Sequence, residues 1–145
     1  MNRQAGNEID ERIREAVAMN LGNASPDEIA ALLSNTLRDS TSFDRAYGIE
    51  QDSPVKARVR KFLSDCSAQL KAELCEDGKL KASWDKALRD DSLSDILKAL
   101  STALLGMINP AFAAPSVAVL AALWLLRMGL NSWCSRTVDQ LLANA

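Results

Sequence analysis

The most constraining feature of the sequence is a long uncharged segment that runs from Ala99 to Leu126. Most of its side chains are aliphatic or aromatic, and the part from Val117 onward is apolar on every side of a helix. A helix that is hydrophobic all round is enclosed either by other helices or by lipid. Protein or lipid must therefore keep this segment from water.

Charge is distributed unevenly along the chain. The 145 residues include 17 basic and 19 acidic side chains, a formal net charge of -2, and beyond Lys98 only Arg127, Arg136 and Asp139 are charged. This balance gives no electrostatic reason to expect a nucleic-acid partner. The length is that of one domain, so we expect a single helical domain over 1–145.

The spacing of apolar residues predicts an all-α fold, because no stretch shows the strict alternation of a half-buried strand. We expect a single-domain bundle of about six helices with a hydrophobic C-terminal helical hairpin. Charged amphipathic helices occupy 1–91 in this interpretation, and the hairpin and a C-terminal helix occupy 92–145. The helices are expected near residues 7–21, 26–37, 54–77, 80–88, 92–108 and 115–126, the last continuing after a bend at Gly129.

Local signals add detail to three of these helices. Ser25-Pro26-Asp27-Glu28 combines an N-cap, a first-turn proline and the glutamate of a capping box, so the second helix should start there. The stretch 39–52 is rich in Ser, Thr, Asp and Gly, which predicts a frayed helix end and a loop holding Phe43 and Tyr47. The apolar stripe of the first helix should comprise Ile9, Ile13, Ala16 and Val17, and that of the fifth should begin at Leu93.

The hydrophobic hairpin is expected over Ser92–Leu130, with its tip at Asn109–Pro115, because two prolines interrupt any single straight helix. Its limbs reach only about 15–17 Å each, against a hydrocarbon thickness of about 30 Å. Three arrangements remain open at this stage. The other helices enclose the hairpin, the hairpin resides in a membrane, or a bundle hides it and exposes it to a membrane on a trigger.

The three cysteines, Cys66, Cys75 and Cys134, lack CxxC spacing and are odd in number. This usage is typical of a reducing compartment, so structural free thiols are expected, with a reactive Cys75 as the alternative. Cys66 and Cys75 lie on one expected helix, too far apart along its axis for a disulfide. No secretory signal peptide is recognised at the N-terminus, so we expect a cytoplasmic protein, which in the membrane alternatives lies at the inner face of a membrane.

A basic cluster lies at 56–61, where four cations flank Ala57 and Val59. We interpret it as the solvated face of an amphipathic helix. Cations are unfavourable at a helix N-terminus, so an acidic partner is expected nearby. The tryptophans Trp84, Trp124 and Trp133 are expected to anchor a core or an interface, and Trp133 fits a bilayer boundary equally well.

The residue content excludes several chemistries. Histidine is absent, which removes Ser/His/Asp and Cys/His nucleophile arrangements and every zinc site that contains histidine. The sequence has no glycine-rich phosphate loop, nucleophile elbow or metal-ligand cluster. We therefore expect no enzyme activity, no cofactor and no small-molecule substrate.

The resulting hypothesis is a non-catalytic intracellular helical interaction module that self-associates or binds a protein partner through an apolar helix face. The alternative is a membrane-active effector or small membrane protein that inserts the 92–130 hairpin into a bilayer. Both use the same residues of the hairpin. These candidates for interaction or insertion are Leu100, Leu104, Ile108, Phe112, Val117, Leu120, Leu123 and Trp124.

Overall fold

A computed structural model describes residues 2–19, 23–40, 42–50, 54–76, 79–89, 93–109 and 113–143. Within these ranges the chain forms helices and no strands, which confirms the all-α prediction. The described helices number nine rather than about six. They are α1 (Asn2–Ala18), α2 (Pro26–Ser40), α3 (Phe43–Tyr47), α4 (Val55–Cys75), α5 (Lys79–Arg89), α6 (Leu93–Met107), α7 (Pro115–Met128), α8 (Leu130–Ser135) and α9 (Val138–Ala143).

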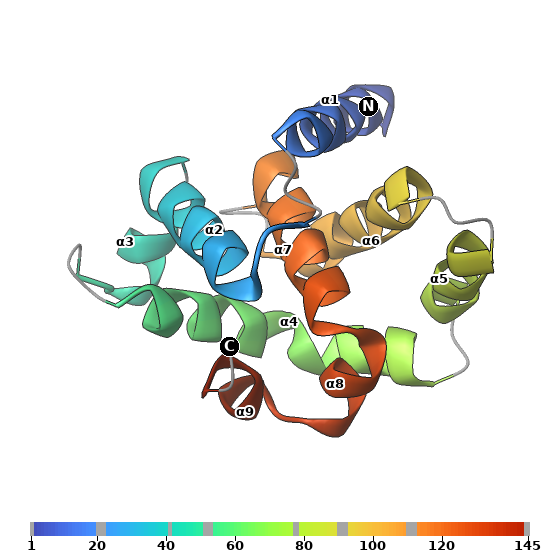
Figure 1. Cartoon of the computed structure of the whole chain (residues 1–145). Coiled ribbons are helices and arrows are strands. Elements are labelled where there is room, and N and C mark those ends of the chain that lie inside the picture. Colours follow the sequence, from blue (N-terminus) through green and yellow to red (C-terminus); the bar gives the residue numbers. More distant parts are fainter. Residues whose placement is uncertain are drawn as a thin grey trace.

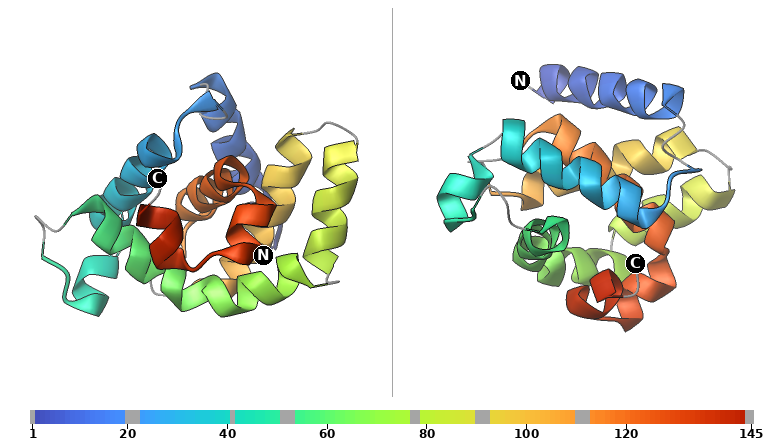
Figure 2. Two further views of the ribbon diagram at one scale, coloured as in Figure 1. Left: turned by 60° about the horizontal axis from the view of Figure 1, so that its bottom comes forward. Right: turned by 60° about the vertical axis from the view of Figure 1, so that its left-hand side comes forward.

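The helices lie in three levels around α7 (Figures 1 and 2). In the right-hand view of Figure 2, α1 crosses the top of the molecule, and α4, α8 and α9 lie at the bottom. Between them, α7 packs against α2 on one side and α6 on the other, and it also contacts α1 and α8. The helix with the most apolar sequence therefore occupies the centre.

Burial along α7 is nearly complete. Between Val117 and Leu125, every side chain except Leu120 is at most 2% exposed. Alanines at 118, 121 and 122 keep parts of the helix surface small, which permits close approach of neighbouring helices. The apolar segment is thus enclosed by helices of its own chain. No helix in the described ranges combines the length and the apolar character needed to cross a membrane.

Local signals at two helix ends behave as the sequence predicts. The Ser25 hydroxyl oxygen accepts a hydrogen bond from the Glu28 backbone N–H at 3.2 Å, so Ser25 caps α2. The Glu28 carboxylate, however, accepts from the Ser25 hydroxyl at 3.1 Å, so this contact differs from the usual bond to the N-cap backbone. Gly129 has φ +90, a backbone conformation that favours glycine, and it separates α7 from α8 at the predicted bend.

Several expected details are wrong. Phe43 and Tyr47 lie on α3 rather than in a loop, and Phe43 is fully buried with its ring edge-on to Phe62 at 6.3 Å. This aromatic packing stabilises helical structure that the polar local sequence does not indicate. Val17 is 53% exposed because it lies on the last turn of α1, which packs mainly on α6 and α7. Leu93 is 43% exposed because it is the first residue of α6.

Ser101 is the buried polar exception on α6. Its side chain is fully buried, and its hydroxyl finds no hydrogen-bond partner in the described part of the chain. We expect Ser101→Ala to raise the free energy of unfolding by about 1 kcal/mol, because it removes an unpaired hydroxyl and improves helix propensity. Urea denaturation measures this change. Ser64→Ala, at an exposed position of α4, should raise the free energy of unfolding by only about a few tenths of a kcal/mol. An equal gain in both variants would contradict the argument.

Candidate functional site

The structure places the eight sequence-predicted site residues in three kinds of position. Leu120 is partly exposed, and Phe112 lies outside the described residues. The other six are core residues at most 5% exposed: Leu100, Leu104, Ile108, Val117, Leu123 and Trp124. In this fold, therefore, Leu120 is the one described candidate that reaches the surface. Roles of the others in interaction or insertion stay predictions.

The most prominent polar cluster is centred on Arg58 of α4. Its side chain is 2% exposed and forms a two-pronged ion pair with Asp44 of α3, through Nε at 2.7 Å and Nη2 at 2.9 Å. Nη1 donates to the Ser34 hydroxyl of α2 at 2.9 Å, and Nη2 also donates to the Glu50 carbonyl. The expected solvated face is wrong for Arg58, whereas the acidic partner expected for this cluster is present.

The donors of Arg58 are committed to partners within the chain, so the cluster joins α2, α3 and α4 and leaves no guanidinium edge for an external anion. Removing one member of such a pair leaves a desolvated charge behind, which is more damaging than removing both. The structure therefore assigns Arg58 an architectural role. A double-mutant comparison can test that assignment.

We expect Arg58→Met to lower the free energy of unfolding by about 3–5 kcal/mol, because Asp44 keeps its charge without a partner. Adding Asp44→Asn should recover part of this loss. Arg60→Met is the matched control: the Arg60 side chain is 56% exposed, and its loss should matter by less than about 1 kcal/mol. Denaturant titration measures the free energy of unfolding of all three variants. The interpretation is overturned if Arg58→Met alone is as stable as Arg58→Met/Asp44→Asn.

Tyr47 adds a second link between α3 and α4 through a hydrogen bond from its hydroxyl to the Asp65 carboxylate. That hydrogen bond, together with burial and the Asp65 charge, raises the pKa of Tyr47 to about 12. The bond stabilises the neutral phenol. Its contribution to stability is therefore fully present below the ordinary tyrosine pKa of about 10 and is lost as pH rises through about 12.

The chain has one tyrosine, so tyrosinate absorbance reports Tyr47 alone. We expect an ultraviolet titration midpoint near 12 for the folded protein. Asp65→Asn should return the midpoint toward about 10, because the charged acceptor is gone. A midpoint that does not move in Asp65→Asn would show that the carboxylate does not hold the phenol proton.

The cysteines differ from expectation. Cys75 of α4 and Cys134 of α8 form a disulfide with Cα atoms 5.6 Å apart and a sequence separation of 59 residues. Free thiols were the wrong prediction for this pair, and the reactive Cys75 thiol is excluded with it. Cys66 is free and buried, and burial, with a smaller effect of the Asp65 charge, raises its pKa to about 11. Spacing does not reveal the pairing, because only the fold brings the end of α4 to α8.

The candidate interaction site is a groove of about 160 Å³ between α1, α2 and α7. Apolar side chains form most of its wall, and Leu120 lies in it. An ion pair between Arg12 and Glu15, at 2.8 Å, lies among its lining residues. The lining comprises Arg12, Glu15, Ala16, Met19, Leu32, Thr36, Ser116, Val119 and Leu120.

One of the most exposed large apolar side chains lines this groove, and a second lies two residues earlier on α1 and projects in a different direction. Met19, which is 64% exposed, lines it, and Val17 on the last turn of α1 is 53% exposed. Sequence reasoning assigned Val17 to the core and overlooked Met19. One signal could have indicated both residues: the apolar stripe of α1 is wider than the surface that the helix buries. We call the groove together with Met19 the α1 face.

A larger hollow of about 520 Å³ lies between α4, α5 and α6. Its lining mixes the carboxylates of Glu73 and Asp95 with Lys98 and small hydroxyl side chains, so it presents no single chemistry to a ligand. Across the described ranges, no three acidic, cysteine or histidine side chains gather in an arrangement that could hold a metal ion. The α1 face is therefore the more defined surface.

Comparisons with known proteins add no relative: no family model matches the chain, and neither curated sequences nor solved structures give a significant match.

Proposed function

We propose that the protein is a non-catalytic helical interaction module that self-associates through the α1 face. The observation that carries this proposal is the juxtaposition of an apolar groove with the exposed apolar side chain of Met19, which lines it. Because α7 is enclosed by its own chain, its burial does not require a partner. The exposed apolar surface instead lies at the end of α1, where a partner would remove it from water.

A second copy of the chain suits this surface better than an unrelated protein does. A two-fold symmetric interface needs self-complementarity, with both members of every contact on one patch. The α1 face has a projection at Met19 beside a recess at Leu120, and it has both charges of a cross-interface pair in Arg12 and Glu15. The patch is small, so we expect a weak dimer of micromolar affinity.

The finer view of the fold is part of the same proposal. We treat residues 1–145 as one domain, supported by a continuous buried cluster that draws residues from all nine described helices. We treat α6 and α7, which pack against each other, as the hydrophobic hairpin of that domain. Its insertion into a bilayer and the cytoplasmic location stay predictions.

Sedimentation velocity across the micromolar range tests self-association with a matched pair of variants. Met19→Gln should shift the protein to monomer, because the apolar projection beside the groove is lost. Val55→Gln/Leu93→Gln removes two other exposed large apolar side chains of the described ranges, neither of which lines the groove, and should dimerise as the unchanged protein does. A protein that is monomeric throughout, or equal effects of both variants, would contradict the proposal.

Charge reversal sharpens the test of symmetry. Arg12→Glu alone and Glu15→Arg alone should each weaken the dimer, because like charges then meet across the two-fold axis. The double reversal should restore it. Flotation with vesicles of anionic phospholipid examines the alternative: binding that survives Met19→Gln and needs the hairpin would favour membrane insertion over self-association.

A further inference from the structure

The disulfide joins α4 to the C-terminal segment at an accessible position. Cys134 is exposed and Cys75 is half-buried, so a reductant can reach the bond from solvent. The helices that it holds, α8 and α9, have six residues each, too short to be stable without tertiary contacts. Their contacts are made mainly with α4, and α8 also packs on α7. The bond therefore holds a segment that has little stability of its own.

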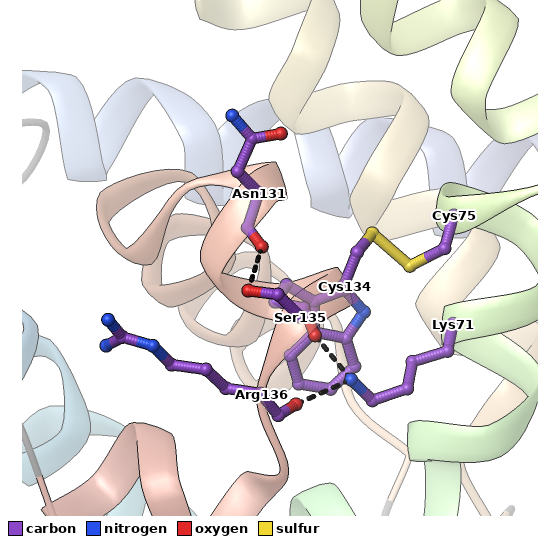
Figure 3. The surroundings of a disulfide bond; sticks show 7 residues. Lys71, Cys75, Asn131, Cys134, Ser135 and Arg136 are labelled. Atoms are coloured by element: carbon purple, nitrogen blue, oxygen red, sulfur yellow. Dashed lines mark hydrogen bonds between the residues drawn. A yellow bond between two sulfur atoms is a disulfide. The ribbon is translucent and has the colours of Figure 1, made fainter.

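Lys71 holds the same segment one turn earlier on α4, and Figure 3 shows both side chains reaching toward α8. Its Nζ lies 4.7 Å from the centre of the Trp133 ring and donates hydrogen bonds to the carbonyl oxygens of Trp133 and Arg136. Partial desolvation lowers the pKa of Lys71. We call this lysine, the disulfide and Trp133 the α4–α8 clamp.

The clamp closes over the C-terminal half of α7. Trp133 is 1% exposed and meets Trp124 of α7 edge-on, with ring centres 6.4 Å apart. Neither indole N–H has a hydrogen-bond acceptor in the described part of the chain, although both are buried. An unpaired buried donor destabilises the closed arrangement, and opening would give both donors water. The disulfide therefore holds together a contact in which the two unpaired indole N–H groups oppose closure.

We propose that the Cys75–Cys134 disulfide is a redox-operated lock, and that a dithiol reductant opens it and releases α8 and α9 from α4. One reductant thiolate attacks the sulfur of Cys134, the more exposed residue of the pair, and forms a mixed disulfide, and Cys75 leaves as a thiolate. The second reductant thiol displaces Cys134. Two electrons and two protons pass to the cysteine pair, and the dithiol becomes a disulfide. Opening brings Trp133 and the Trp124 end of α7 to solvent.

Hydrogen exchange of the full-length protein, with and without dithiothreitol, tests the lock. In the reduced protein we expect amide exchange in 130–143 to accelerate about tenfold or more, with α2 and α6 protected as before. Reoxidation should restore the slow exchange. Unchanged protection in 130–143 would overturn the proposal, and so would equal loss of protection along the whole chain, which would make the bond a global staple.

Variants separate the lock from simple cross-linking. Cys75→Ser/Cys134→Ser should exchange like the reduced protein in either redox state, whereas Cys66→Ala should keep the full redox response. Lys71→Met should stay closed when oxidised and open further than the unchanged protein when reduced, because the remaining contacts to α8 are lost. If Lys71→Met changes nothing in the reduced protein, the clamp does not operate as described. The lock is independent of the α1 face, whose groove lies at the other half of α7.

Discussion

The structure depends on one constraint: α7 has no polar side to turn toward water. Each of the other described helices carries charged or hydroxyl side chains on one face, but from Val117 to Leu125 the central helix has only apolar side chains. Its neighbours must therefore surround it, and α2, α6, α1 and α8 do so from different directions. Hydrophobic burial of this kind is non-directional, so it favours a compact arrangement without specifying which helix lies where.

Directional contacts supply that specificity. Arg58 reaches Ser34 on α2 and Asp44 on α3, which sets the position of α4 relative to both helices. At the other end of α4, Lys71 and Cys75 set the position of α8. The longest helix of the described chain is thus attached at its two ends by polar or covalent contacts, while its middle is held by apolar side chains such as Phe62 and Leu70. Buried polar contacts of this sort select one packing among several of similar hydrophobic energy.

The sequence is informative where a short segment determines its own structure. The all-α class, the cap at Ser25 and the bend at Gly129 follow from patterns within a few turns. Enclosure of the apolar helix after Pro115 by other helices was one of three arrangements that the sequence left open. The sequence is uninformative where distant segments meet. Burial of Arg58, the helix at Phe43 and the pairing of Cys75 with Cys134 depend on separations that no local pattern encodes. In the candidate site, the sequence predicted Leu120 and missed Met19. Val17, on the same helix as Met19, was assigned to the core. Both errors arise because the number of side chains that α1 buries depends on how many helices it packs against, which the sequence of α1 alone does not show.

The two halves of α7 are covered by different means, and this difference has a physical consequence. The N-terminal half lies under α1, a helix that packs mainly on α6 and α7 through Ile9, Ile13 and Ala16 and an ion pair from Asp10 to Lys98 at 3.3 Å. The C-terminal half lies under α8, whose cover includes a covalent bond. Loop-closure entropy for a separation of this length corresponds to about 4 kcal/mol, comparable to the whole contribution expected from burying two large apolar side chains. Burial of the C-terminal half of α7 under α8 therefore depends on the redox state of the surroundings. Burial of the N-terminal half under α1 depends on noncovalent packing and on any partner that binds beside α1.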